Sequence, residues 1–298
     1  MKVFVTGASG FIGSAVVREL VQEGYSVTGL ARSDESAKAL VAAGAQVHRG
    51  DLEDLESLKR GAAASEGVIH TGFIHEFARF KEVCEIDRRA IGALGSVLVG
   101  TDRPLVVTSG TAMVAPGRLA TESDVPTLNS SQMPRVATDE AVVFVLSRGV
   151  RAIEVRNPPS VHGEGDHGFV PTLINVAREK GVSAYVGDGA NRWPAVHRLD
   201  SAHLYRLALE KGSRGSRYHA VAEEGITLKK IAQAIGEHLG VPAASKTHEE
   251  ATQHFGWFAP FVSLDCPASS ERTRAQLGWS ASRPTLLQDL EHGSYFGH

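Results

Sequence analysis

Apolar and polar positions in the first half of the chain follow two alternating patterns. Short β-rich apolar runs, expected as strands, cover residues 2–6, 25–30, 45–50, 67–72, 103–109 and 150–158. Runs with apolar residues three and four positions apart, expected as helices, cover residues 11–24, 34–44, 80–99 and 135–149. Strands separated by helices in this way predict an α/β fold with a doubly wound parallel sheet and right-handed crossovers.

The pattern loosens after Pro159. Glycine and proline become frequent, and the helical runs shorten to residues 199–211, 227–239, 270–277 and 284–292. We expect a core domain over residues 1–158. Residues 159–298 are expected to form mainly a smaller substrate-binding lobe, which returns in part to the core sheet. Because an open α/β sheet binds ligands beyond the carboxyl ends of its strands, this lobe is expected to cover that edge.

The run TGASGFIG (6–13) follows the first predicted strand at once and opens the first predicted helix. Glycine permits the tight turn and lets the backbone approach a pyrophosphate, which then sits on the amides of the helix N-terminus. This context favours a dinucleotide site over a plain turn, and it makes residues 1–158 the dinucleotide-binding domain. Contacts to the cofactor are expected from Gly7, Ser9, Gly10, Phe11, Ile12 and Gly13.

Further motifs carry a family resemblance. After TGASGFIG the chain reads, in order, GDLED (50–54), VIHTG (68–72), VVTSGT (106–111) and RNPPSVHG (156–163). This series resembles the extended and atypical short-chain dehydrogenase/reductases, a group that includes NAD-dependent epimerases and dihydroflavonol-reductase-like enzymes. The resemblance covers nearly the whole chain, and it implies a Rossmann-like fold with a nicotinamide cofactor.

The resemblance also assigns positions around that cofactor. It implies that Asp51 and Leu52 hold the adenine, and that Thr71, Gly72 and Phe73 run beneath the cofactor. Three further residues of the matched segments are expected beside it, namely Thr108, Pro158 and Val161.

The end of the second predicted strand bears on the choice of cofactor. An NAD binder places a carboxylate there for the ribose hydroxyls, whereas a 2′-phosphate needs an arginine. Here Ala31 stands where the acid would be, and Arg32 and Ser33 follow it. The sequence therefore favours NADP(H), although NAD(H) stays possible if Arg32 is only a solvated loop charge.

The reactive end departs from the family pattern. The family uses a Ser or Thr, and a Tyr followed by Lys at the fourth position. Ser109 and Thr111 match the hydroxyl group, but Arg135 and Asp139 stand at the Tyr and Lys positions. None of the five tyrosines is followed by lysine at the fourth position, so the dyad is absent.

Arg135 and Asp139 have two interpretations. They can form an i,i+4 helix pair that contributes a few tenths of a kcal/mol. Alternatively, Arg135 projects into the cleft, is held there by Asp139, and anchors or polarises a substrate oxygen. Arginine cannot donate the proton near neutral pH. His162, at a position where relatives often have tyrosine, is the candidate donor, with a packed wall residue as the alternative. We expect His70 and His197 to be structural.

Composition removes several other classes of function. The net charge of -3 gives no reason to expect nucleic acid or an anionic membrane as a partner. Two cysteines cannot form a disulfide framework, and the histidine and acidic residues near position 165 lack a known metal-ligand spacing, so no metal is expected. No run of about 18 apolar residues occurs, and a cytoplasmic protein is expected.

The sequence thus predicts an NADPH-dependent oxidoreductase that reduces a carbonyl group of a small to medium, partly hydrophobic organic substrate. A non-catalytic NADP(H)-binding sensor and a sugar-nucleotide epimerase or dehydratase are the alternatives. Proteins that this chain resembles often dimerise through the helices found here at about 80–99 and 135–148, so a homodimer is expected. Seven aromatic residues could line a hydrophobic pocket or belong to the core: Phe169, Tyr185, Trp193, Phe255, Trp257, Phe258 and Phe261.

Overall fold

The computed structural model describes residues 1–296. Its centre is a parallel sheet of seven strands in the order β3-β2-β1-β4-β5-β6-β10. The strands are β1 (Lys2–Thr6), β2 (Ser26–Ala31), β3 (Gln46–Arg49), β4 (Gly67–His70), β5 (Pro104–Gly110), β6 (Arg151–Asn157) and β10 (Arg217–His219). The order reverses at β1, so a ligand crevice is expected between the carboxyl ends of β1 and β4. The predicted doubly wound α/β fold is confirmed.

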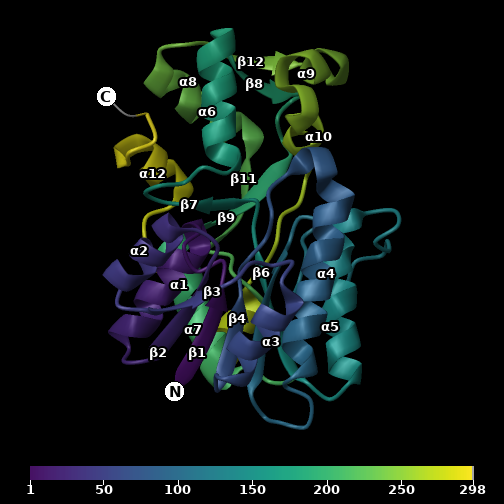
Figure 1. Ribbon diagram of the computed structural model, residues 1–298. Coiled ribbons are helices and arrows are strands. Elements are labelled where there is room, and N and C mark those ends of the chain that lie inside the picture. The colour runs from purple at the N-terminus through teal and green to yellow at the C-terminus, as the bar shows by residue number, and fades with distance from the viewer. Residues whose placement is uncertain (297–298) are drawn as a thin grey trace.

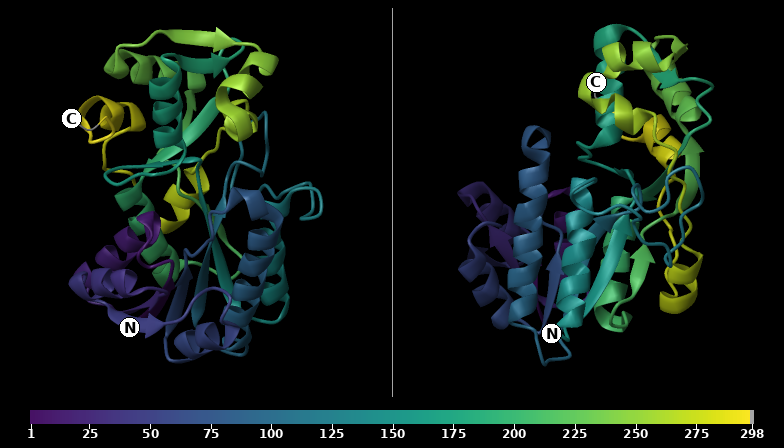
Figure 2. Two further views of the ribbon diagram at one scale, coloured as in Figure 1. Left: turned by 45° about the horizontal axis from the view of Figure 1, so that its top comes forward. Right: turned by 90° about the vertical axis from the view of Figure 1, so that its right-hand side faces the viewer.

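Helices cover both faces of this sheet because successive side chains of each strand point to opposite faces. Val3 and Val5 pack among α1, α2 and α7, while Phe4 packs among α3 and α4. The left view of Figure 2 shows α1 and α4 on opposite sides of the strands. The core helices are α1 (Phe11–Gln22), α2 (Asp34–Ala42), α3 (Leu55–Ala63), α4 (Phe80–Ser96), α5 (Ala137–Ser147), α7 (Arg198–Lys211) and α11 (Glu271–Leu277), with the 3-10 turns η1 (Phe77–Arg79) and η2 (Pro134–Val136).

A smaller lobe lies beyond the carboxyl ends of the core strands, at the top of Figure 1. It contains the sheets β11-β9-β7 and β12-β8. Its strands are β7 (Ser160–His162), β8 (Ser183–Val186), β9 (Arg192–His197), β11 (Glu223–Thr227) and β12 (Ala243–Lys246). Its helices are α6 (Phe169–Lys180), α8 (Leu228–Leu239), α9 (His248–Phe255), η3 (Gly256–Phe258), α10 (Ala259–Val262) and α12 (Leu286–His292).

The part of the chain after residue 158 contributes to both layers. β10 pairs with β6 at the edge of the core sheet, and α7 packs beside α1. The predicted core strands and helices occur within a few residues of their expected limits. The short strands of the small lobe were not predicted, because runs of three to six residues between glycines carry little periodicity.

Candidate functional site

The glycine-rich turn after β1 lies directly against the end of β4. Gly7 has φ +64°, and the amide of Gly10 donates to its carbonyl at 2.9 Å. A Cβ atom on Gly7 would lie 2.6 Å from the amide nitrogen of Gly72, and one on Gly13 would lie 2.0 Å from the carbonyl oxygen of Gly7. Real Cβ atoms do not approach so closely, so only glycine fits either position.

The first turn of α1 follows the glycine-rich turn directly. Gly10 is its N-cap, and no side chain among the described residues caps the helix there. The leading amides, beginning at Phe11 and Ile12, therefore have no partner within the helix, and the helix dipole adds positive potential. Ser9 is exposed beside them. These features fit the pyrophosphate of a dinucleotide, which needs close backbone approach and several N–H donors.

The adenosine end of such a cofactor would meet β2 and the turn after β3. Arg32 is exposed directly after the buried Ala31, and Ser33 caps α2 by accepting from the amide of Ser36 at 3.1 Å. Asp51 holds its own turn, since its Oδ1 accepts from the amides of Glu53 and Asp54. Leu52 lies close to Gly72, because a Cβ there would be 3.0 Å from the Leu52 methyl.

Arg198, the first residue of the core helix α7, and His167 of the small lobe both contact the glycine-rich turn. The Arg198 guanidinium stacks on the Phe11 ring with its carbon 5.0 Å from the centroid, and its Nη1 donates to the carbonyl of Glu164 at 2.8 Å. The His167 ring is 5.7 Å from the same Phe11 ring. Arg198 could thus supply a cation to a bound pyrophosphate. Sequence reasoning missed it, because nothing in its spacing links it to residue 11.

The hydroxyl pair predicted at the reactive end lies on and just after β5. Ser109 is buried, and its Oγ donates to Oδ2 of Asp139 at 3.3 Å. Thr111 is also buried, and its Oγ1 has no hydrogen-bond partner among the described residues. A buried hydroxyl left unpaired costs about 1–3 kcal/mol, and a bound carbonyl group would remove that cost. Thr108 donates to the carbonyl of His70 at 2.8 Å, which joins β5 to β4.

The predicted pairing of Arg135 with Asp139 is wrong. Arg135 lies in the 3-10 turn η2, and α5 begins only at Ala137, so the two residues do not share one α-helical face. Nη1 of Arg135 instead donates to Oδ2 of Asp87 on α4 at 2.9 Å, and also contacts Thr138. Its guanidinium carbon lies 4.3 Å from the centre of the Phe73 ring. Asp139 pairs with Arg156 of β6, whose Nη2 is 3.1 Å from its Oδ1.

A buried chain of hydrogen bonds fixes Asp87 beneath Arg135. His70 bonds Thr6 Oγ1 through Nδ1 at 2.7 Å and Asp87 Oδ1 through Nε2 at 2.9 Å. Burial would raise the pKa of Asp87, but the charge of Arg135 and the hydrogen bond from His70 outweigh it and hold this pKa below its ordinary value. Asp87 is therefore a fixed anion, and His70 acts as its support.

Asp139 lies in a different electrostatic environment. Burial, aided by the Glu154 carboxylate, raises the pKa of Asp139 to about 7 against the opposing charges of Arg156 and Arg135. Burial also acts on Glu154, but the charge and hydrogen bond of Arg156 and the charge of Arg217 hold the Glu154 pKa below its ordinary value. Of the two carboxyl groups, Glu154 is thus the anion and Asp139 carries the titrating proton near neutral pH.

The structure places His162 in the wall of the small lobe. Its side chain is fully buried, its Nδ1 lies 2.7 Å from Oδ2 of Asp289 on α12, and its Nε2 has no hydrogen-bond partner among the described residues. Because Ser109 and Thr111 are buried as well, burial does not decide between a wall residue and a proton donor, and the role of His162 stays a prediction. His197 caps α7 by accepting from the amide of Leu199 at 3.2 Å. Pro158 is buried and Val161 half-buried between β6 and this wall.

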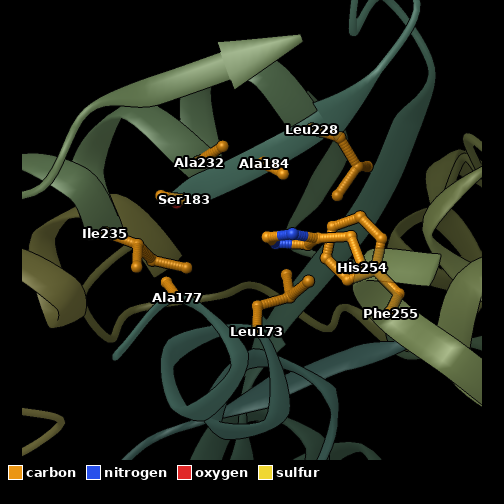
Figure 3. A pocket seen from close by; sticks show the side chains of 9 residues that line it. All are labelled: Leu173, Ala177, Ser183, Ala184, Leu228, Ala232, Ile235, His254 and Phe255. Atoms are coloured by element: carbon orange, nitrogen blue, oxygen red, sulfur yellow. The ribbon is translucent and has the colours of Figure 1, made fainter. Parts of the chain in front are cut away.

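Most aromatic residues of the small lobe belong to its core, whereas Trp257 is 56% exposed. Four rings contact one another: Phe169, Trp193, Phe258 and Phe261. Ala112, directly after Thr111, packs against the apolar core that includes these rings. Figure 3 shows Phe255 with other apolar side chains around His254, but these side chains leave no room for a water molecule between them. We therefore do not assign this region to a substrate.

Residues 1–296 contain no group of three or more His, Cys, Asp and Glu side chains placed to hold a metal ion. Within that same range, no helix combines the length and hydrophobicity needed to span a bilayer.

Comparison with known proteins assigns the family. The model of the NAD dependent epimerase/dehydratase family matches residues 3–222. The chain belongs to this family. An uncharacterized protein of Schizosaccharomyces pombe is 53% identical over 298 residues, covering 99% of this chain and 100% of that protein. This family belongs to an oxidoreductase superfamily. Its members are typically enzymes.

Two more distant proteins are similar to nearly the whole chain. The 4-hydroxy-2-methyl-3-oxo-4-farnesyl-3,4-dihydroquinoline-1-oxide ketoreductase of Stigmatella aurantiaca is 28% identical over 322 residues, covering 98% of this chain and 95% of its own. The dTDP-glucose 4,6-dehydratase of Streptomyces venezuelae, solved with NAD bound, shares the fold with a TM-score of 0.79 at 18% identity, covering 99% and 97% of the two chains.

Proposed function

We propose that this protein is an NADPH-dependent carbonyl reductase acting on a small to medium, partly hydrophobic organic substrate. One observation carries the proposal: Ser109 Oγ lies 3.3 Å from a buried acid, Asp139, beside the unpartnered hydroxyl of Thr111. A hydroxyl that can bond a carbonyl oxygen and an acid that can replace its proton are the two elements that carbonyl reduction requires of the protein. Ser109 lies near the carboxyl end of β5, at the ligand-binding edge of the sheet, and Asp139 contacts it from α5.

The glycine-rich turn, the α1 amides and Arg198 would hold the cofactor. When bound, a dihydronicotinamide supplies hydride to the carbonyl carbon. Phe73 and Gly72 lie at the end of β4, next to Gly7, and would form the floor of that site. The ketoreductase from Stigmatella aurantiaca supports a reductase, because it matches this chain over almost its whole length.

The proton would follow a short path. Ser109 donates its hydroxyl proton to the carbonyl oxygen as the carbon–oxygen double bond becomes a single bond. Asp139, in its acid form, then returns a proton to Ser109 Oγ across 3.3 Å. Its pKa of about 7 suits this role, since an acid works best when its pKa lies near the operating pH. Asp139 would thus replace the proton-donating tyrosine of the family, and Arg135 would orient the substrate.

The preference for NADPH rests on the end of β2. Ala31 is buried and has no carboxylate for the ribose hydroxyls, whereas Arg32 is exposed next to the N-terminus of α2. An arginine beside a helix N-terminus is suited to a phosphate monoester. This arrangement supports the 2′-phosphate of NADPH over the free hydroxyl of NADH.

The proposal is tested by following NADPH absorbance with a panel of ketones, aldehydes and quinones, and with alcohols for the reverse reaction. We expect turnover of at least one carbonyl class. Ser109→Ala should lower kcat by about 10²-fold while NADPH affinity stays unchanged, because one donor to the developing alkoxide is lost. Cofactor binding with no turnover across the panel would contradict the proposal and indicate a sensor.

A further inference from the structure

We infer that Arg135 is a carboxylate-binding residue and that the substrate of this site is a carbonyl compound carrying a carboxylate, such as an oxo acid. This inference rests on the proposed function for the reaction, while the carboxylate site itself stands on the geometry of Arg135. The residue lies where its family has the catalytic tyrosine, in a turn that faces Phe73.

The guanidinium of Arg135 has one edge bound and one edge free. Nη1 contacts Asp87 Oδ2 and Thr138, while Nε and Nη2 have no hydrogen-bond partner among residues 1–296. In a planar guanidinium, Nε–H and one Nη2–H point the same way along one edge. Their spacing matches the two oxygens of a carboxylate, which such an edge binds in a bidentate manner.

The surroundings hold this free edge in place. Asp87 is almost completely buried and is itself bonded to His70, so the anchor cannot swing away from Arg135. Phe73 packs on the guanidinium face at 4.3 Å, which limits rotation of the plane. The Arg135 side chain remains 17% exposed. A solvent-reachable cation with fixed orientation binds an anion with little further loss of entropy.

The charges near Arg135 favour a monoanion. Asp87 offsets part of its charge, so a phosphate dianion would meet less compensation than a carboxylate. Burial, and then the charges of Arg135 and His167, lower the pKa of His75, so this ring adds little positive charge near Arg135 at neutral pH. The free edge of Arg135 therefore supplies donors for one carboxylate.

The test measures binding of an inert carboxylate apart from turnover. Butanoate, butanamide and inorganic phosphate are titrated by calorimetry into the NADP⁺-loaded protein. We expect butanoate to bind at least about 10-fold more tightly than butanamide, and more tightly than phosphate. Arg135→Lys keeps the charge but loses the bidentate edge, and it should remove most of this preference. The exposed Arg272 of α11 provides the matched control, because Arg272→Ala should change nothing.

Turnover separates this inference from the proposed function. NADPH oxidation is compared for 3-oxobutanoate and its methyl ester, which share the ketone and differ in charge. A preference for the acid that disappears in Arg135→Lys supports both proposals. Arg135-dependent butanoate binding without any reduction keeps the carboxylate site and overturns the reductase. Equal binding of butanoate and butanamide, tighter phosphate binding, or an unchanged preference in Arg135→Lys would overturn the carboxylate site. Thermal unfolding of each variant shows whether it is folded.

Discussion

Asp139 links the buried charges of β6 to the reactive hydroxyl. Its proton is held in an environment set by Glu154 and Arg156 on β6 and by Arg135 in η2. Reduction needs the acid form, so the rate of carbonyl reduction should fall as the pH rises through about 7, and alcohol oxidation should rise over the same range. Asp139→Asn keeps the shape but cannot exchange the proton. It should lower kcat by about 10²-fold and remove this pH dependence. A wild-type pH profile retained in Asp139→Asn would exclude Asp139 as the acid.

Arg32 is the residue expected to decide whether NADPH or NADH binds more tightly. Arg32→Glu places a carboxylate beside the ribose, so it should weaken NADPH binding by about 10-fold or more and improve NADH binding. Calorimetry with both cofactors measures the two effects. Arg18 of α1, on another element, offers an Arg→Glu control that should leave the ratio of affinities unchanged. Equal affinities in the unmodified protein would contradict this assignment.

Sequence reasoning singled out the residues proposed as reactive but not their partners. Arg135 and Asp139 were found because their positions follow β5 at the family's spacing, whereas Asp87 lies 48 residues earlier on α4. Spacing along a helix reveals only neighbours on that helix, and the short 3-10 turn at Pro134–Val136 removed even that relation. Arg198 and Arg156 were missed because tertiary packing alone brings them to Phe11 and Asp139.

Most strands and helices of the core were predictable, as were the small-lobe helices α8 and α12, but the strands of the small lobe were not. Buried strands such as β1 form continuous apolar runs, and helices such as α1 repeat apolar residues every three or four positions. The pairs β7–β9 and β8–β12 join segments far apart in the chain through only a few residues each. Such short pairings depend on tertiary packing, which no local pattern encodes.

The turn between β1 and α1 can be tested for its role in holding the cofactor pyrophosphate. Gly13→Ala places a methyl group 2.0 Å from the Gly7 carbonyl, so it should open the turn, abolish detectable NADPH binding and lower the melting temperature. Gly92→Ala in α4 is the matched control, since a Cβ there meets nothing within 4 Å. That change should stabilise the protein by about 0.5–1 kcal/mol, because alanine favours the helix. Normal cofactor affinity in Gly13→Ala would show that this turn does not hold the pyrophosphate.

At the scale of the whole molecule, α4 and α5 pack side by side on one face of the sheet. Val143 and Phe144 of α5 are 55% and 54% exposed, which is unusual for large apolar side chains. We predict a homodimer through this pair of helices. Val143→Asp should convert it to a monomer in light scattering. Val41→Asp, at a 64% exposed position of α2, should not. A monomeric unmodified protein would contradict the dimer.

The central claim is that hydride reaches a carbonyl carbon in this site while Ser109 and Asp139 supply the proton. The direct measurement uses NADPH deuterated at the transferred position, together with 3-oxobutanoate and a panel of neutral ketones, and mass spectrometry of the products. We expect the unmodified protein to form an alcohol that carries one deuterium on carbon. The yield of this alcohol should be strongly reduced in both Ser109→Ala and Asp139→Asn. Bound NADPH that passes no deuterium to any carbonyl, or full transfer in both variants, would contradict the central claim.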